Sequence, residues 1–364
     1  MTVVQEPISI RLEASTFCQL KCPSCPTAQG ETKKNLGSGF LAFKNFKDLV
    51  DRNPAIVHIE LSNWGEIFLN PELTEIMKYA YQKGVILTAS NGANLNTVKP
   101  EVLENLVKYK FRHIDCSIDG ASQETYKQYR VGGDFDRVIE NIKTINHYKK
   151  IYKSDFPLLL WQFVAFGHNE HEIQTARELA KDLNMEFYLK LSWDEEVSPI
   201  QDKELVRQQT SSGVSSRSEY AETYGTGYIR KDICQQLWTS PQVNWDGRVL
   251  GCCFNYWGDF GNMFEADGKQ GYQEKVGYAQ DMVMGKAEPR DDIPCTRCEH
   301  YKTMQASGDW MTTENLRGPT ASPIVAQIAK RCGRLMISIL NRSEWLSSRF
   351  LKPAIVNSNK TLRE

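Results

Sequence analysis

The sequence predicts an α/β protein in which repeated strand and helix units build a parallel sheet, with a smaller module after it. Short β-branched or apolar runs alternate with helix-period segments over the first two hundred residues. The chain has 364 residues, enough for a core domain of about 200 residues and a second one. Six such units form an open doubly wound sheet or a partial barrel, and in both folds the chemistry lies at the carboxyl ends of the strands.

The alternation predicts six strands, each followed by a helix. The expected strands lie near residues 8–14, 56–62, 85–90, 112–118, 157–164 and 186–192. The expected helices fill most of 43–53, 71–82, 100–109, 122–128, 134–151 and 169–184. We expect a core domain over 1–197, a polar linker or lid over 198–233, a second module over 234–302 and a basic helical extension over 303–364.

The second module and the extension have their own patterns. Asp246-Gly247, between Val243 and Leu250, predicts a hairpin with a type I′ turn. Apolar residues recur at helical spacing near the carboxyl end, namely Ile324, Val325, Ile328, Cys332, Leu335, Met336, Ile339 and Leu340, with Lys330, Arg331, Arg334 and Arg342 opposite. A basic amphipathic helix of this kind packs on its own domain or makes a peripheral membrane contact.

Composition and charge exclude some classes of protein. The 44 Lys and Arg residues balance 45 Asp and Glu, which argues against a nucleic-acid binder. The amino terminus has no secretory pattern, and no apolar run reaches the roughly 18 residues of a membrane span. We therefore expect a cytoplasmic protein, in which the 10 cysteines are thiols or metal ligands rather than disulfides.

Three of these cysteines, Cys18, Cys22 and Cys25, form C-x3-C-x2-C directly after the first expected strand. A zinc site wants a fourth ligand, and the next Cys or His in the sequence is His58. An iron-sulfur cube held by three cysteines leaves one iron open to bind another molecule. The position at a carboxyl strand end favours the cluster.

Residues 8–192 resemble the radical S-adenosylmethionine (SAM) superfamily, whose C-x3-C-x2-C loop follows the first strand of a partial (β/α)6 barrel. Trp64-Gly65-Glu66 is similar to the family's Gly-Gly-Glu motif, which contacts the methionyl amine of SAM. Trp64 replaces the first glycine, so the resemblance assigns that contact to Gly65 and Glu66. Ser24 stands where many members have an aromatic residue beside adenine.

Polar residues at later strand ends extend the resemblance. Ser90-Asn91-Gly92 ends the third expected strand and Ser117-Ile-Asp119 the fourth, where the family binds the methionine carboxylate or the ribose. Arg130 stands where related enzymes hold the SAM carboxylate. The resemblance implies a [4Fe-4S] cluster, SAM, an electron donor such as flavodoxin or ferredoxin, and formation of a 5′-deoxyadenosyl radical that abstracts hydrogen from a substrate.

A second cysteine set comprises Cys234, Cys252 or Cys253, Cys295 and Cys298. Four thiolates suit structural zinc as well as iron. The surrounding sequence resembles the auxiliary cluster domains called SPASM and twitch. The further cysteines of a full SPASM domain are missing after Cys298, which implies one auxiliary [4Fe-4S] cluster, and Gly247-x4-Cys252 favours Cys252 as the ligand. Four ligands would saturate this cluster, making it an electron relay suited to net oxidation.

Strand alternation places other polar residues. Gln162 on the fifth expected strand and Lys190 on the sixth are predicted to line the interior, Gln162 as a cofactor contact. Lys190 and Asp194 are candidates for a substrate contact or a proton acceptor, or they form salt bridges at the rim. Cys116 is predicted to pack against the outer helices.

The leading hypothesis is a radical SAM enzyme that oxidises a carbinol or C-H centre of a sugar-like or cyclitol-like small molecule. A peptide-modifying SPASM enzyme, a radical epimerase, and an enzyme of carbon-skeleton rearrangement or crosslinking are alternatives. The early start of the first strand leaves little room for an amino-terminal peptide-binding module. A zinc-structured binding protein is the alternative outside the enzymes.

Overall fold

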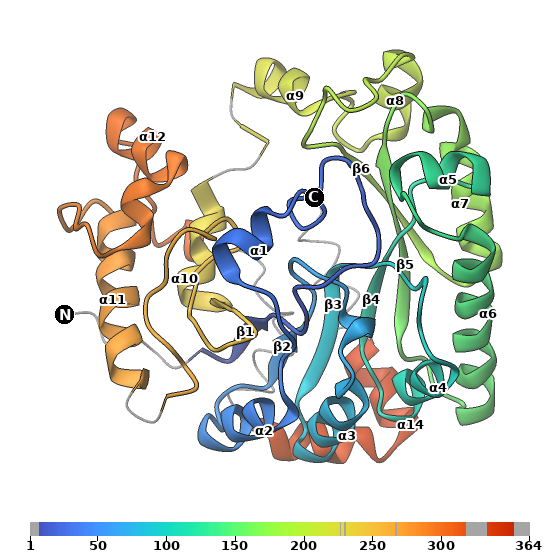
Figure 1. Cartoon of the computed structure of the whole chain (residues 1–364), viewed down its shortest axis with the longest axis horizontal. Coiled ribbons are helices and arrows are strands. Elements are labelled where there is room, and N and C mark those ends of the chain that lie inside the picture. Colours follow the sequence, from blue (N-terminus) through green and yellow to red (C-terminus); the bar gives the residue numbers. More distant parts are fainter. Residues whose placement is uncertain (1–6, 226, 229–230, 266–267, 318–332, 353–364) are drawn as a thin grey trace.

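A parallel sheet of seven strands forms the centre of the computed structural model, which describes residues 7–225, 227–228, 231–265, 268–317 and 333–352 (Figure 1). Its strand order is β6-β5-β4-β3-β2-β1-β7, and each strand is parallel to its neighbours. The first six strands are β1 Ser9–Leu12, β2 His58–Glu60, β3 Ile86–Ala93, β4 His113–Ser117, β5 Leu158–Ala165 and β6 Glu186–Leu191. The prediction of an α/β fold with six strands at these positions is confirmed.

The six expected helices cover the outside of this sheet. They are α2 Phe43–Arg52, α3 Leu73–Lys83, α4 Pro100–Lys108, α5 Gln123–Tyr129, α6 Phe135–Tyr152 and α7 Ile173–Asp182. Local signals set their starts: the side chain of Ser122 accepts from the Thr125 amide before α5, and that of Asp134 accepts from the Arg137 amide before α6. The short helix α1 Glu31–Leu36, which follows the first cysteine loop, was not predicted.

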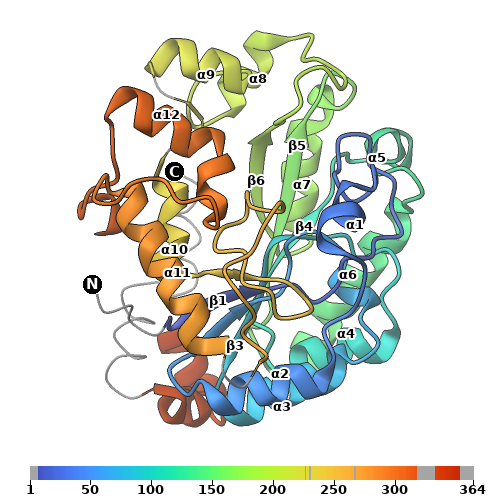
Figure 2. The same cartoon turned by 60° about the vertical axis from the view of Figure 1, so that its left-hand side comes forward.

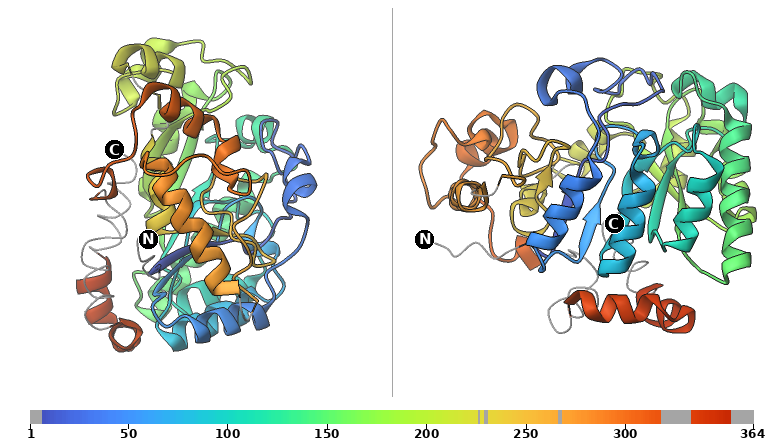
Figure 3. Two further views of the ribbon diagram at one scale, coloured as in Figure 1. Left: turned by 90° about the vertical axis from the view of Figure 1, so that its left-hand side faces the viewer. Right: turned by 60° about the horizontal axis from the view of Figure 1, so that its bottom comes forward.

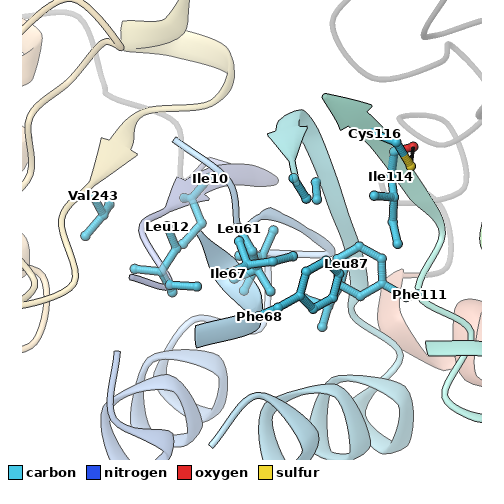
Figure 4. Packing of buried hydrophobic residues seen from close by; sticks show 14 of the residues in the cluster. Ile10, Leu12, Leu61, Ile67, Phe68, Leu87, Phe111, Ile114, Cys116 and Val243 are labelled. Carbon is cyan, nitrogen blue, oxygen red and sulfur yellow. Dashed lines mark hydrogen bonds between the residues drawn. The ribbon is translucent and has the colours of Figure 1, made fainter. Parts of the chain in front are cut away.

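The outer face of the sheet packs on these helices and forms the main core (Figure 4). Ile10 of β1 and Ile114 of β4 belong to it and are fully buried. Cys116 lies beside Ile114 in the same cluster and is also fully buried, as strand alternation predicted. This thiol is therefore a core side chain and lies on the opposite face of the sheet from Ser117.

The seventh strand, β7 Gln242–Val243, is the first arm of the predicted hairpin, and its pairing with the free edge of β1 was not predicted. In this hairpin the Asn244 carbonyl accepts from the Gly247 amide at 2.9 Å. The expected type I′ turn is wrong, because that turn needs positive φ at both central residues and only Gly247 has it (φ 92°), whereas Asp246 does not. A left-handed glycine after an ordinary turn makes a three-residue hairpin with a bulge.

The polar stretch expected as a linker contains two helices, α8 Lys203–Gln209 and α9 Arg217–Tyr224. Val206 and Val214 of this stretch are buried in the main core. Arg207 pairs with Glu219 at 2.7 Å and so connects the two helices. One serine of this stretch caps a helix, since the side chain of Ser216 accepts from the Glu219 amide at the start of α9.

The carboxyl-terminal helix, described over 333–341, lies under the amino-terminal ends of the strands (Figure 3). Arg334 donates to the carbonyls of Val50, Asn53 and Ile56, at 2.6 to 2.7 Å, around the end of α2. These carbonyls lie where a helix leaves acceptors without intrahelical partners. Ile337 is buried against the amino ends of β2 and β3.

The expected faces of this helix are partly wrong. Leu335 and Ile339, predicted for the packed stripe, are 73% and 45% exposed, whereas Arg334, predicted for the polar side, faces the domain. Hydrogen bonds to the carbonyls outweigh the apolar pattern here. Met336 and Leu340 do pack on the domain in a cluster with Phe156, and Arg342 is exposed, as predicted. The remaining predicted members of the stripe and of its basic side, Ile324, Val325, Ile328, Lys330, Arg331 and Cys332, lie outside the described residues.

Buried Arg112, which precedes β4, attaches the carboxyl-terminal segment to the domain. Its guanidinium donates to the side chains of Asn341 and Ser347 and lies 4.4 Å from the centre of the Phe156 ring. Burial lowers the pKa of Arg112 to about 9.

Among the described helices, none combines the length and the apolar character that crossing a membrane requires.

Candidate active site

The first cysteine loop begins at the carboxyl end of β1, where the fold predicts the chemistry. Cys22 is buried, and its carbonyl accepts from the Cys25 amide at 3.1 Å, which folds the loop back on itself. Burial raises the pKa of Cys18 to about 12, and the nearby thiols of Cys22 and Cys25 contribute to the rise. Burial also raises the pKa of Cys22, so without a metal the thiols of Cys18 and Cys22 hold their protons.

The surroundings of the loop fit an iron-sulfur cluster. Arg130 donates through Nη1 toward the Cys22 sulfur at 3.7 Å, and Asn94 donates through Nδ2 toward the Cys18 sulfur at 3.8 Å. Both contacts suit thiolates that carry negative charge. In the described part of the chain, no three His, Cys, Asp or Glu side chains converge on a point that one ion could occupy. A [4Fe-4S] cluster takes each thiolate on a different iron, so its ligands need no such convergence.

The Trp64-Gly65-Glu66 turn is fixed against this loop by hydrogen bonds. Buried Glu13 accepts from the amides of Trp64 at 2.9 Å and Gly65 at 3.3 Å, and burial raises its pKa to about 8. A Cβ atom on Gly65 would lie 2.1 Å from the Ser15 carbonyl oxygen, so the close approach requires glycine. The Glu66 amide donates to the Phe17 carbonyl at 2.7 Å, directly before the first cysteine.

The Glu66 carboxylate is only 3% exposed and is held by backbone amides. Its oxygens accept from the amides of Phe68 at 3.1 Å and Asn94 at 2.7 Å, and burial raises its pKa to about 7. Asn94 thus connects Glu66 to the cysteine loop, a role that the sequence reasoning missed. The polar run after the third predicted strand was its only signal.

Asp119 and Arg130 form a buried ion pair beside Cys22. Arg130 donates from Nε to Asp119 at 2.6 Å, and the Asp119 side chain is fully buried. The other Asp119 oxygen accepts from the Val164 amide at 2.8 Å. Asp119 therefore fixes the Arg130 guanidinium, whose Nη1 faces the cysteine loop.

A row of polar side chains lies on the interior face of the sheet and comprises Ser117 and Gln162. Ser117 of β4 and Gln162 of β5 are register partners, and both are buried. Gly92 has φ 123°, and a Cβ atom there would lie 2.5 Å from the Ser117 hydroxyl. Asn91 is exposed and donates to the Asn63 carbonyl at 2.9 Å, so it stands apart from this row.

Ser24, which departs from the family pattern, is 1% exposed and lies 3.2 Å from the Tyr129 hydroxyl. The Tyr129 ring packs on Phe166, with ring centres 4.4 Å apart, in the same apolar cluster as Cys22. A tyrosine from α5 and a phenylalanine after β5 therefore supply aromatic surface beside the cysteine loop. The sequence reasoning did not assign this role to either residue.

Lys190 and Asp194 occupy different environments at the carboxyl end of β6. Lys190 is the register partner of Val164, which packs with the cysteine loop, so the two side chains leave the sheet on the same face. Burial is the main cause that lowers the pKa of Lys190, and the positive charge of Arg217 lowers it further. The Asp194 carboxylate instead accepts from the amides of Glu196 and Val197 and orders the turn after the strand.

The second cysteine set surrounds a single cavity. Its lining includes Cys234, Cys252, Cys295 and Cys298, the four predicted ligands. The rest of the lining is mostly apolar or aromatic: Leu237, Leu250, Asn255, Trp257, Phe260, Val283, Pro294 and Tyr301. Cys234 comes from the turn η3 Lys231–Gln235, Cys252 follows the hairpin, and Cys295 and Cys298 come from the turn before α12 Glu299–Ser307.

The adjacent Cys252 and Cys253 have different surroundings. Cys253 is absent from the cavity lining and bonds the side chain of Gln236 instead. Its amide donates to Gln236 Oε1 at 2.9 Å, and its sulfur accepts from Gln236 Nε2 at 3.5 Å. Burial raises the pKa of the Cys252 thiol to about 12. This arrangement favours Cys252 as the fourth ligand of any metal in the cavity.

Three aromatic rings connect the two cysteine sites. The Trp64 and Tyr256 rings meet edge to face at 6.0 Å, and Tyr256 meets Trp257 in the same way at 5.4 Å. Trp257 lines the four-cysteine cavity and donates to the Pro294 carbonyl at 3.0 Å. The tryptophan that departs from the Gly-Gly-Glu pattern is thus a contact with the second module, which lies beside β1 (Figure 2).

The chain carries a domain of the radical SAM superfamily, whose family model matches residues 12–180. Residues 12–180 therefore form a radical SAM domain, the class of domain that the first cysteine loop predicted. The superfamily assignment implies a [4Fe-4S] cluster and SAM, and the donor set of the Cys18–Cys25 loop fits that cluster.

The chain is similar to two curated proteins over part of its length. It is 29% identical to the AdoMet-dependent heme synthase of Methanosarcina barkeri over 191 residues, which cover 52% of this chain and 51% of that protein. It is 25% identical to the mycofactocin maturase MftC of Mycobacterium tuberculosis over 142 residues, 38% and 34% of the two chains. The similarity thus spans about half or less of each relative.

Two solved structures share the fold. Native anSMEcpe with bound AdoMet has a TM-score of 0.53 and 15% identity, over 97% of this chain and all of that one. Streptococcus suis SuiB bound to the precursor peptide SuiA has a TM-score of 0.53 and 15% identity, over 81% of this chain and 70% of that one. At this identity the likeness establishes the architecture alone.

Proposed function

We propose that this protein is a radical SAM enzyme with two [4Fe-4S] clusters, one held by Cys18, Cys22 and Cys25 and the other by Cys234, Cys252, Cys295 and Cys298. When bound, the first cluster and SAM supply a 5′-deoxyadenosyl radical that abstracts hydrogen from the substrate. The observation that carries the second assignment is the cavity that collects four cysteines from three separate segments.

The residues around the first loop have distinct tasks in this proposal. Gly65 and Glu66 lie next to the loop and would contact the methionine amine of SAM. Ser117, Gln162 and Arg130 would supply polar contacts from the interior of the sheet, with Asp119 positioning Arg130. The exposed position of Asn91 assigns it to the rim of the site.

We propose oxidation of a C-H centre as the reaction, because a cluster with four cysteine ligands has no position for the substrate and suits electron transfer. A sugar-like or cyclitol-like molecule is the first candidate substrate. A peptide is the second, because SuiB shares the fold and its structure contains a precursor peptide. The electrons for SAM cleavage would come from a flavodoxin or ferredoxin.

Anaerobic reconstitution of the full chain tests the proposal. We expect about eight iron and eight sulfide per chain. With reductant and SAM, the protein should form 5′-deoxyadenosine and methionine. Zinc in place of iron, or no 5′-deoxyadenosine from protein with full iron content, would contradict the assignment. Comparing oxidised products from a cyclitol panel and a peptide panel then separates the two substrate classes.

The neighbouring cysteines provide a matched test of the auxiliary site. Cys252→Ser is expected to lower the iron content from about eight to about four per chain, because it removes a thiol from the cavity wall. Cys253→Ser should keep about eight, since that sulfur bonds Gln236. Iron analysis and ultraviolet-visible spectra check both results, and equal iron in the two variants would refute the ligand assignment.

A further inference from the structure

Two cations lie at the carboxyl end of β6, next to the interior face that carries the proposed SAM contacts. Lys190 projects to the same side as Val164, whose neighbours are the cysteine loop and Tyr129. Arg217, the first residue of α9, donates from Nε to the Leu191 carbonyl at 3.2 Å. This bond fixes the guanidinium beside the residue that follows Lys190, and each cation is partly buried.

The carboxylates around these cations are committed to other partners. Asp119 pairs with Arg130, and Asp115 pairs with His113. Glu195 accepts from the amide and hydroxyl of Ser218, at 2.8 and 2.5 Å. Over the part of the chain that the structure describes, neither Lys190 nor Arg217 lies within ion-pair distance of these carboxylates. They act on the two cations only from farther away, Asp115 and Asp119 on Lys190 and Glu195 on Arg217.

Other charged groups nearby are also engaged. Asp194 binds the amides of the turn after β6. Glu219 pairs with Arg207 and also accepts from Ser215. The partial burial of two positive charges next to each other is costly without an anion. Among the described residues, no carboxylate therefore contacts either cation directly, and a bound anion would supply that contact.

The Arg217 guanidinium is prepared for a ligand by its own contacts. Its carbon lies 4.7 Å from the centre of the Tyr228 ring, so the plane of the group is supported from one side. A guanidinium held in this way loses little conformational entropy when it binds an oxyanion through two parallel hydrogen bonds. The Lys190 ammonium adds a second charge on the side of the cysteine loop.

We propose that Lys190 and Arg217 bind an anionic group of the substrate, a carboxylate or a phosphate. The inference rests on the proposed function, since it places this group at the carboxyl end of β6, beside the site of hydrogen abstraction. It narrows the substrate class to acids: a sugar or cyclitol acid, a phosphorylated small molecule, or a peptide with a carboxylate near the reacting carbon. A neutral sugar or cyclitol does not satisfy the two cations.

Calorimetric titration of the reconstituted full chain with malonate and with inorganic phosphate tests the site without SAM or reductant. We expect saturable binding of at least one probe. Lys190→Met and Arg217→Gln should each weaken that binding roughly tenfold or more, the scale of one charge-assisted hydrogen bond. Lys181→Met, at an exposed lysine in α7, is the control and should bind like the parent.

Preference for malonate would identify a carboxylate, and preference for phosphate a phosphoryl group. No saturable binding by the parent, or equal binding by the parent and the Lys190 variant, would overturn the proposal. Far-ultraviolet circular dichroism verifies the fold of each variant, and the Lys190 variant decides the outcome if the Arg217 variant misfolds. Because SAM cleavage is measured separately, a protein that cleaves SAM but binds neither probe would disprove the anion site alone.

Discussion

Replacing Cys22 by alanine is expected to reduce the cleavage of SAM to the rate measured without protein. This residue is the middle cysteine of the loop, is buried, and receives the Arg130 contact. Two thiols cannot replace three around a [4Fe-4S] cluster that also binds SAM. Because enzymes accelerate their reactions by roughly 10⁶-fold or more, the fall should cover several orders of magnitude. Chromatographic measurement of 5′-deoxyadenosine and methionine checks it.

Cys116→Ala is the matched control for this experiment. It also removes one buried thiol, but from the outer face of β4, where the side chain packs in the core. We expect its iron content to equal that of the parent and its rate of SAM cleavage to stay within about twofold once rates are normalised to folded protein. Formation of 5′-deoxyadenosine by the Cys22 variant at the parental rate would exclude the loop as the catalytic centre.

Asn341→Leu is expected to lower the free energy of unfolding by about 3 kcal/mol. The substitution removes an acceptor from the buried Arg112 guanidinium, which then keeps only the Ser347 hydroxyl as a polar partner among its described contacts. A buried charge without its acceptor retains the full desolvation penalty. Urea unfolding followed by circular dichroism, under anaerobic conditions, measures the change.

The double variant Arg112→Leu with Asn341→Leu isolates the cause. Once the charge is absent, the loss of the Asn341 acceptor should cost much less, so the double variant is expected to recover more than half of the loss. Strictly additive losses would show that Asn341 stabilises the protein by a route independent of Arg112. SAM cleavage should persist in both variants, because Arg112 directly precedes β4 whereas the cysteine loop follows the carboxyl end of β1, so the two lie at opposite ends of the parallel strands.

The sequence was most informative where the physical signal is local. Alternating apolar runs located β1 to β6, and polar residues such as Ser122 and Asp134 marked the starts of helices. The pairing of β7 with β1 escaped prediction because two residues carry no periodicity, and because the pairing depends on the free edge of a strand about 230 residues away. The position of Arg334 also depended on distant carbonyls, which no helical pattern reveals.

The candidate site also has features that the sequence alone predicts and features that only the fold reveals. The spacing of Cys18, Cys22 and Cys25 is a property of one loop and was readable directly. The choice of Cys252 followed from a short motif and stays a prediction; of the two adjacent cysteines, Cys252 is the one that lines the cavity. The Asn94 contacts and the pairing of Asp119 with Arg130 beside Cys22 required the fold, because they join side chains from separate strand ends.

The pairing of β7 with β1 has a mechanical consequence for the two cysteine sites. Backbone hydrogen bonds join the strands, from the Arg11 amide to the Pro241 carbonyl at 3.1 Å and from the Glu13 amide to the Val243 carbonyl at 2.9 Å. Cys18 follows one of these strands, while Cys234 precedes the other and Cys252 follows it. The separation between the sites is therefore set by the stiffness of one continuous sheet, and a hinge between them would have to break its ladder.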